Sequence, residues 1–245
     1  MIHDDVRFSI YFGDAKDHMY PAQYQQWKAV DLMNHPPAKA ISNALDIDHL
    51  LFLKQVHGTN GMRATRELIE DIDPFVIEGD FLITQESHFG IGVMTADCLP
   101  VVCYDISHHV AGIAHAGWRG AVAGVVDAML QMMHEQCGTM ITDTLFFFGP
   151  SAKQCCYQVD DAFGRYVAPY SFADAVLERR AGTTYFDLPG FVQRQLLEMG
   201  IQESQIRLNY NSCTVCDHRF CSHRRATQAG TASAEGRQMT VVAVK

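Results

Sequence analysis

The stretch from Ile91 to Gly120 reads IGVMTADCLPVVCYDISHHVAGIAHAGWRG and contains three apolar runs separated by short turns. Ile91–Thr95, Pro100–Tyr104 and Val110–Ala114 carry apolar residues at consecutive positions, which is typical of strands buried on both faces. Because these strands follow one another with no helical segment between them, the pattern favours an α+β fold over a regular alternation of strands and helices.

The flanking segments extend this pattern in both directions. Leu50–Val56 and Asp80–Thr84 predict two earlier strands, and the apolar residues from Val122 to Met133 recur at helical spacing up to Gly138, as in a helix packed on the core. A second helix is predicted between Asp187, as its N-cap, and Gly200. Three more strands are predicted at Thr144–Phe148, Gln205–Tyr210 and Met239–Val244.

The first 49 residues look different, because Pro21, Pro36 and Pro37 interrupt any long element there. We find no repeat, low-complexity tract or linker that would divide the chain. We therefore expect a single α+β domain over residues 1–245, with mixed β-sheets and flanking helices. Within it, residues 1–49 form an atypical N-terminal segment and residues 50–245 form the core.

Composition excludes several classes of protein. The net charge of −9 argues against binding of a nucleic-acid backbone. The N-terminus is acidic where a signal peptide is basic, and no apolar run approaches the ~20 residues that span a bilayer. We expect a cytoplasmic enzyme that acts on small molecules. Its eight cysteines are then buried hydrophobic residues, metal ligands or nucleophiles and do not form disulfides.

Three segments place a reactive side chain at the end of a predicted strand, next to glycine or proline. They are Gln55-Val56-His57-Gly58, Thr95-Ala96-Asp97-Cys98-Leu99-Pro100 and His115-Ala116-Gly117-Trp118-Arg119-Gly120. Rigid scaffolds present reactive groups at such strand ends. Each residue alone also fits a structural role, so the hypothesis of a site depends on whether the three segments converge.

If they converge, two chemistries are open. One thiolate and two imidazoles make a three-ligand zinc site with a free fourth position. Alternatively, Cys98 is itself a nucleophile and one histidine is its base. Asp97 is a proton donor or acceptor in either scheme, or it only caps a turn.

The turn after His115 also suggests an anion site. It leads from a strand into a helix, where free N–H groups favour anions, and Arg119 adds a guanidinium suited to phosphate. A solvated Arg119 at the helix start is the structural alternative. The basic run His223-Arg224-Arg225 either reaches this pocket or forms a surface turn.

The remaining cysteines give weaker signals. Cys213, Cys216, Cys221 and His223 have the spacing C-x2-C-x4-C-x-H, which is tighter than that of most structural zinc sites. We interpret Cys155-Cys156 as a packing pair, because adjacent cysteines do not easily chelate one ion.

The motifs QVHG, EGD, TADCLP and HAGWRG, in this order from Gln55 to Gly120, resemble those of the YfiH family, formerly called polyphenol oxidoreductase laccases. The similarity continues with Gly149-Pro150, Cys155-Cys156-Tyr157, Cys213-Thr214 and Ser222-His223-Arg224-Arg225. The resemblance implies a single domain of the type likened to bacterial toxin deamidases. It also implies a catalytic zinc ion bound by His57, Cys98 and His115, with Asp97 beside it and with Arg119, Ser222 and Arg225 contacting substrate or phosphate.

The activity implied by this resemblance is that of a purine nucleoside phosphorylase. Such enzymes use phosphate to convert adenosine, inosine or methylthioadenosine to the free base and a ribose 1-phosphate, and they also deaminate adenosine. Zinc fits better than copper, because none of the 12 histidines forms the His-X-His pair of multicopper oxidases.

The chain also departs from the family pattern. Residues 1–49 lack a Gly-Gly turn and an Asn-Leu segment, and Cys221 and His223 replace a Phe and a Tyr in the late motif. A divergent paralogue that binds ligand without turnover, and a metal-free Cys-His thiol hydrolase or amidase, are therefore the alternatives.

Overall fold

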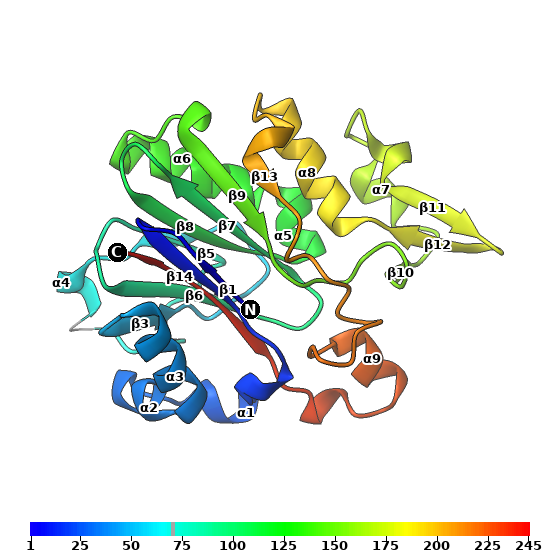
Figure 1. Ribbon diagram of the computed structural model, residues 1–245. Coiled ribbons are helices and arrows are strands. Elements are labelled where there is room, and N and C mark those ends of the chain that lie inside the picture. Colours follow the sequence, from blue (N-terminus) through cyan, green and yellow to red (C-terminus); the bar gives the residue numbers. More distant parts are fainter. Residues whose placement is uncertain (70–71) are drawn as a thin grey trace.

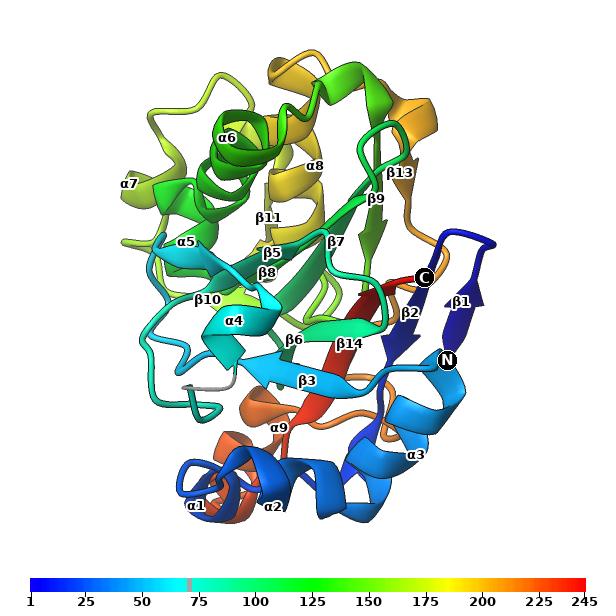
Figure 2. The ribbon, with the colours of Figure 1, turned by 90° about the vertical axis from the view of Figure 1, so that its left-hand side faces the viewer.

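Two β-sheets packed face to face between two groups of helices make up most of the molecule (Figure 1, Figure 2). The computed structural model describes residues 1–69 and 72–245. In Figure 1, α6 and α8 lie above the sheets and α1, α2 and α3 lie below them. The expected single domain with mixed sheets and flanking helices is thus confirmed.

The first sheet joins the two ends of the chain. The second strand of the chain, β2, pairs antiparallel with the last, β14, with Phe8 opposite Val244 and Phe12 opposite Thr240. Its only parallel pair among the described residues is β3 with β6. In spatial order its strands are β1 (Ile2–Asp4), β2 (Phe8–Phe12), β14 (Gln238–Val244), β6 (Phe89–Thr95) and β3 (His49–Phe52).

The second sheet carries the long strands predicted from the middle of the sequence. Its centre is the antiparallel hairpin of β7 and β8, in which Leu99 pairs with Ala116. The chain passes from β6 in the first sheet to β7 in the second through Ala96, Asp97 and Cys98. In spatial order its strands are β13 (Ile206–Arg207), β9 (Thr144–Phe148), β7 (Leu99–Asp105), β8 (Val110–Ala116), β5 (Phe81–Thr84) and β4 (Gly61–Arg63).

A small third sheet and the helices complete the fold. The sheet consists of β10 (Gln158–Val159), β12 (Thr183–Phe186) and β11 (Leu177–Arg180). The α-helices are α1 (Pro21–Tyr24), α2 (Ala29–Asn34), α3 (Pro36–Leu45), α4 (Arg66–Ile69), α5 (Trp118–Ala123), α6 (Val125–Cys137), α7 (Gly164–Val167), α8 (Leu188–Glu198) and α9 (His223–Gln228). Short 3-10 turns occur at Ala15–Asp17, Ile141–Asp143, Ala173–Ala175, Glu203–Gln205 and Ala232–Ala234.

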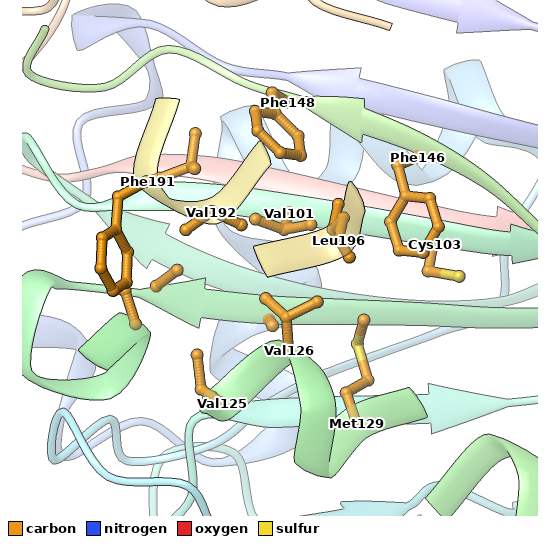
Figure 3. Close-up of a cluster of buried hydrophobic side chains, with 14 of the residues drawn as sticks. Val101, Cys103, Val125, Val126, Met129, Phe146, Phe148, Phe191, Val192 and Leu196 are labelled. Carbon is orange, nitrogen blue, oxygen red and sulfur yellow. The ribbon is translucent and has the colours of Figure 1, made fainter. Parts of the chain in front are cut away.

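Three apolar clusters hold these layers together. One lies between the two large sheets, and another lies between the first sheet and the N-terminal helices. The third packs α6 and α8 on the outer face of the second sheet; Figure 3 shows Val126 and Met129 of α6 facing Val101 of β7 and Leu196 of α8. The strands of the second sheet are therefore covered on both faces, which explains their continuous apolar runs.

The structure bears out most of the predicted elements. The strand Thr144–Phe148 matches β9 at both ends, and the predicted helix after Asp187 is α8, whose N-cap Asp187 accepts a hydrogen bond from the Gly190 N–H. The helix predicted after Gly120 is instead two helices, because Gly124 adopts a left-handed conformation with φ of 89°. Of the strand predicted at Gln205–Tyr210, only Ile206–Arg207 forms a strand, β13.

The N-terminal segment is more regular than its prolines predicted. Pro36 and Pro37 begin α3 instead of interrupting it. The N–H groups of the first helical turn have no acceptor within the helix, so a proline there removes no hydrogen bond, and its fixed φ fits the helix. This helix runs for 10 residues and buries Ile41 and Leu45 against the first sheet. Within the described residues, no helix is both long and apolar enough to span a membrane.

Asp17 is a buried carboxyl group that makes stability depend on pH. Its side chain accepts hydrogen bonds from the Tyr11 hydroxyl and from the Met239 N–H. Burial raises the pKa of Asp17 from 3.8 to about 7, despite these hydrogen bonds. Because the folded pKa lies above the unfolded one, the stabilising protonated form is fully present below about pH 4 and is lost as the pH rises through about 7.

We expect Asp17→Asn to remove this pH dependence. The amide accepts from the Met239 N–H and donates to the Tyr11 hydroxyl, so both contacts persist without a buried charge. The free energy of unfolding of the variant should exceed that of the wild type at pH 8 by up to about 4 kcal/mol, and the difference should vanish near pH 4. Urea unfolding at both pH values measures this. The exposed Asp174→Asn is the control, and parallel pH profiles for wild type and Asp17→Asn would reject the prediction.

Candidate metal centre and cavity

The candidate site is built around the buried carboxylate of Asp80, which precedes β5. Its two oxygens accept the backbone N–H groups of Val56, His57 and Gly58 at 3.2, 2.9 and 2.6 Å. Its Oδ1 also accepts the Nδ1–H of His115 at 2.8 Å. One carboxylate therefore fixes the loop that carries His57 and the ring orientation of His115 at the end of β8.

A second contact anchors the His57 loop to the first sheet. The side-chain amide of Gln55 donates to the Met94 carbonyl at 2.8 Å and accepts the Met94 N–H at 2.7 Å. His57 itself has a positive φ of 61°, a conformation that this bonding stabilises. The loop is thus fastened both to β6, through Met94, and to the start of β5, through Asp80.

The three predicted residues His57, Cys98 and His115 meet. Their ligand atoms all lie within 4.8 Å of one another, and the Cys98 Sγ lies 3.7 Å from the His57 Nε2. Because the Nδ1 of His115 donates to Asp80, its Nε2 is the ring nitrogen that faces Cys98 and is positioned to bind an ion. A thiolate and two imidazoles at this spacing fit a zinc ion with one open coordination position.

Gly117 leaves the space that this cluster needs. A Cβ at Gly117 would lie 2.6 Å from the His57 Cδ2 and 3.0 Å from the Cys98 Sγ. The first separation is too short for a carbon atom and the second is unusually tight, so a side chain at position 117 would displace His57 and press on Cys98. The Gly-Trp-Arg-Gly turn is therefore part of the site and not only a connection between β8 and α5.

The electrostatics of the cluster favour an ionised thiol. Burial raises the pKa of Cys98, but the charges and hydrogen bonds of His115 and His57 outweigh burial and bring it from 9.0 down to about 6. Burial lowers the pKa of His115, but the Cys98 thiolate and Asp80 raise it to about 9. The pKa of Asp80 is lowered, because the hydrogen bonds from His115 and from the His57 loop outweigh its burial. Cys98 is thus a thiolate near neutral pH, the form needed by both a metal ligand and a nucleophile.

The cluster opens into a cavity of about 580 Å³. Four aromatic side chains in its wall, from Tyr24, Phe75, Trp118 and Tyr157, offer flat apolar surface. A second hollow of about 620 Å³ adjoins it and shares Trp118, Arg119, Tyr157 and Arg224. Pockets of this size bind small molecules.

Two arginines supply positive charge where the hollows meet. The Arg119 guanidinium lies over the Trp118 ring at 4.4 Å from its centroid, and within the described residues it has no hydrogen bond or ion pair. Arg224 lies 5.4 Å from the Tyr157 ring centroid and donates to the Gln158 carbonyl. Arg119 is therefore available to an anionic ligand.

Asp97 lies in the cavity wall beside Cys98, but its carboxylate is engaged elsewhere. Its Oδ1 accepts a hydrogen bond from the Thr214 hydroxyl and its Oδ2 accepts one from the backbone N–H of Arg224, both at 2.6 Å. These bonds connect the crossing between the two sheets to the first turn of α9. The contacts match the turn-capping alternative for Asp97 more closely than proton transfer.

Ser222 and Arg225 do not line the cavity within the described residues. Ser222 is buried and caps α9 by accepting the Arg225 N–H. The Arg225 guanidinium donates to the carbonyls of Thr214, Val215 and Phe220, so it is used within the fold. Their neighbours His223 and Arg224 reach the cavity instead, because the helical turn points successive residues in different directions.

Several residues of the site have no role assigned from the sequence. Asp80 is the last residue of the EGD motif and the first of the predicted strand Asp80–Thr84, and an acidic residue at the start of a strand beside two candidate ligands is a signal for such a role. Tyr24 and Phe75 lay in or near stretches without a clear pattern, and only the fold brings them to the cavity.

The fold and the site together define a mixed α/β protein with a candidate Cys-His-His metal centre in a small-molecule cavity. The sequence profile of the family described as multi-copper polyphenol oxidoreductase laccase matches residues 36–245. The chain belongs to this family, as its motifs predicted.

Solved structures agree with this assignment. YfiH from Bacillus licheniformis superposes with a TM-score of 0.80 at 25% identity, covering 97% of this chain and 93% of that one. YlmD from Geobacillus stearothermophilus superposes with a TM-score of 0.77 at 25% identity, covering 97% and 91%.

Two curated relatives carry enzyme names. A purine nucleoside phosphorylase from Aquifex aeolicus is 35% identical over 155 residues, which are 63% of this chain and 68% of that protein. Adenosine deaminase RL5, from an unknown prokaryotic organism, is 31% identical over 196 residues, or 76% of this chain and 73% of that protein. An enzymatic role related to purine nucleosides is therefore a property of the family.

Proposed function

We propose that this protein is a zinc-dependent purine nucleoside phosphorylase that also deaminates adenosine. The observation that carries the proposal is the convergence of His57, Cys98 and His115 with an unpaired Arg119 in one aromatic-lined cavity. The names of the relatives point to the same reactions. The substrates are adenosine, inosine or methylthioadenosine together with phosphate.

The cavity offers a place for each part of these substrates. The aromatic side chains Tyr24, Phe75, Trp118 and Tyr157 provide faces for a purine ring. Arg119, with Arg224 beside it, binds phosphate through its guanidinium. In phosphorolysis a phosphate oxygen bonds to C1′ of the ribose while the bond from C1′ to the base breaks, and the base leaves with the electron pair and takes up a proton.

The residues of the chain have distinct roles in this proposal. His57, Cys98 and His115 hold the ion, which supplies Lewis-acid stabilisation of negative charge when bound. Asp80 positions both histidines. We assign Asp97 to positioning, because its carboxylate holds Thr214 and the start of α9.

Incubation of the zinc-loaded protein with adenosine, with and without phosphate, tests the reaction. We expect adenine and ribose 1-phosphate only when phosphate is present, and a slower formation of inosine that does not need phosphate. Identification of the products by chromatography and mass spectrometry distinguishes the outcomes. Tight binding of nucleosides with no product from adenosine, inosine or methylthioadenosine would instead identify a non-catalytic binding protein.

The role of Arg119 has its own test. Arg119→Ala should raise the KM for phosphate by about 10-fold or more, corresponding to a lost charge-assisted hydrogen bond of 1.5–3 kcal/mol, with a smaller change in the KM for adenosine. The exposed Arg179→Ala removes the same charge far from the cavity and should change neither value. Equal effects on both KM values would show that Arg119 shapes the cavity without binding phosphate.

A metal-free thiol hydrolase or amidase is the second candidate, and the lowered pKa of Cys98 favours it. That chemistry predicts stoichiometric inactivation by a thiol alkylating reagent in the presence of a chelator, with no loss of activity from the chelator alone. Inactivation by the chelator, reversed by added zinc, would exclude it.

A further inference from the structure

Two loops beside the cavity are joined along their backbones. The Ser151 N–H donates to the Ser212 carbonyl, and the Thr214 N–H donates to the Ser151 carbonyl, both at 3.0 Å. The Asn211 side chain adds a hydrogen bond to the Gly149 carbonyl at 2.6 Å. This pairing brings the Cys155-Cys156 turn of one loop next to Cys213 and Cys216 of the other, which are separated by about 60 residues in sequence.

The four thiols form a compact cluster at this junction. Their sulfur atoms all lie within 4.8 Å of one another. Cys216 Sγ lies 3.5 Å from the Sγ of Cys155 and 2.8 Å from that of Cys156. Around a tetrahedral zinc ion with Zn–S bonds of about 2.3 Å, sulfur atoms are about 3.8 Å apart, whereas a disulfide needs about 2.05 Å. The separation between Cys156 and Cys216 lies between these two values, and the convergence of all four sulfurs on one place fits coordination of one ion, since a disulfide would involve only two of them.

This cluster corrects two interpretations of the sequence. Cys155 is exposed and Cys156 is half-buried, so the pair does not serve core packing. A tight turn, in which the Lys153 carbonyl accepts the N–H groups of both Cys156 and Tyr157, lets adjacent cysteines reach one point. Cys221, in contrast, is buried at a different place, and His223 lies in the main cavity. The grouping of these two with Cys213 and Cys216, which their tight spacing favoured only weakly, therefore does not form.

The sequence spacing of two of the four thiols also suits a metal site. Cys213 and Cys216 have the two-residue separation found in structural zinc sites.

We propose that Cys155, Cys156, Cys213 and Cys216 bind a second, structural zinc ion. Four thiolates complete the tetrahedron, so this ion has no open position and does not take part in catalysis. Its binding releases the thiol protons to solvent. This inference does not depend on the reaction proposed above.

The position of the ion gives it a structural role. Tyr157, which follows Cys156, is part of the cavity wall, and Thr214, which follows Cys213, donates to Asp97. The ion therefore cross-links the loop that carries Tyr157 to the loop whose Thr214 holds Asp97, and both Tyr157 and Asp97 belong to this wall. Its removal should loosen the wall without removing any of His57, Cys98 or His115.

The test counts metal ions in a Cys98→Ala background, which lacks the other centre. Protein purified under reducing conditions with zinc and then dialysed should hold one zinc ion per chain by mass spectrometry of the metal. Adding Cys216→Ser or Cys213→Ser should reduce zinc to about zero. Adding Cys137→Ser, a matched change at a thiol outside both clusters, should leave one ion.

A second measurement covers variants that fail to fold. Cobalt titration of the Cys98→Ala protein should give one equivalent of intense thiolate-to-cobalt absorption, and removing the metal should lower its Tm. No zinc, no such absorption, or a native mass 2 Da lower with two thiols resistant to alkylation would overturn the proposal. The last result would identify a disulfide between Cys156 and Cys216 instead.

Discussion

Cys98→Ala is expected to remove one zinc ion per chain and to lower kcat/KM for phosphorolysis by about 10³-fold or more. The thiolate is one of the three proposed protein ligands and the only one of them with a negative charge, so two neutral imidazoles remain. Loss of a direct ligand should exceed the 10–100-fold effects typical of residues that only support a ligand. Cys98 is half-buried, so the fold should lose no more than about 1 kcal/mol.

The measurements are zinc content, steady-state kinetics and thermal unfolding of the same preparations. Cys137→Ala, which removes a partly buried thiol from the end of α6, should keep both metal content and activity. A Cys98→Ala protein that holds as much zinc per chain as the wild type but has lost activity would make Cys98 a nucleophile and not a ligand. A variant with undiminished turnover would reject both mechanisms.

The sequence predicted the parts of this protein in which local pattern and final environment agree. β9 was predicted to the residue, because five consecutive positions are apolar or β-branched and all belong to one strand of a sheet covered on both faces. His57, Cys98 and His115 were found because each follows such a strand. Their convergence needed the fold, since β3, β6 and β8, which lead to them, belong to two different sheets.

Other features depend on contacts that no local pattern contains. Pro36 and Pro37 indicate a helix start and a helix break equally well, and only packing of Ile41 and Leu45 decides between them. The four-cysteine cluster forms through backbone pairing between loops distant in sequence, so the spacing within one loop can indicate Cys213 and Cys216 but not their partners Cys155 and Cys156. Arg224 rather than Arg225 faces the cavity because of the exact start of a helix of six residues.

Asp80→Asn is expected to have the second largest effect, because Asp80 serves both histidine ligands. The carboxylate accepts four hydrogen bonds and donates none. An asparagine has one accepting oxygen, so if it receives the His115 Nδ1–H and the His57 N–H, its NH₂ group faces the N–H groups of Val56 and Gly58. Buried donors without acceptors cost about 1–3 kcal/mol each, and the loop that carries His57 should move away from Cys98.

We therefore expect Asp80→Asn to weaken zinc binding at this centre by about 10–100-fold and to lower the free energy of unfolding by about 2–4 kcal/mol. Asp105→Asn is a matched control, because Asp105 is also buried and accepts the N–H groups of Ser107 and His108 and the His108 Nδ1–H, away from the cavity. It should destabilise the fold to a similar degree and leave zinc affinity unchanged. Competition with a chromophoric chelator measures that affinity. An equal loss of zinc affinity in the two variants would mean that Asp80 acts only through global stability. Weakened binding in Asp80→Asn alone would assign to this carboxylate the orientation of both histidines.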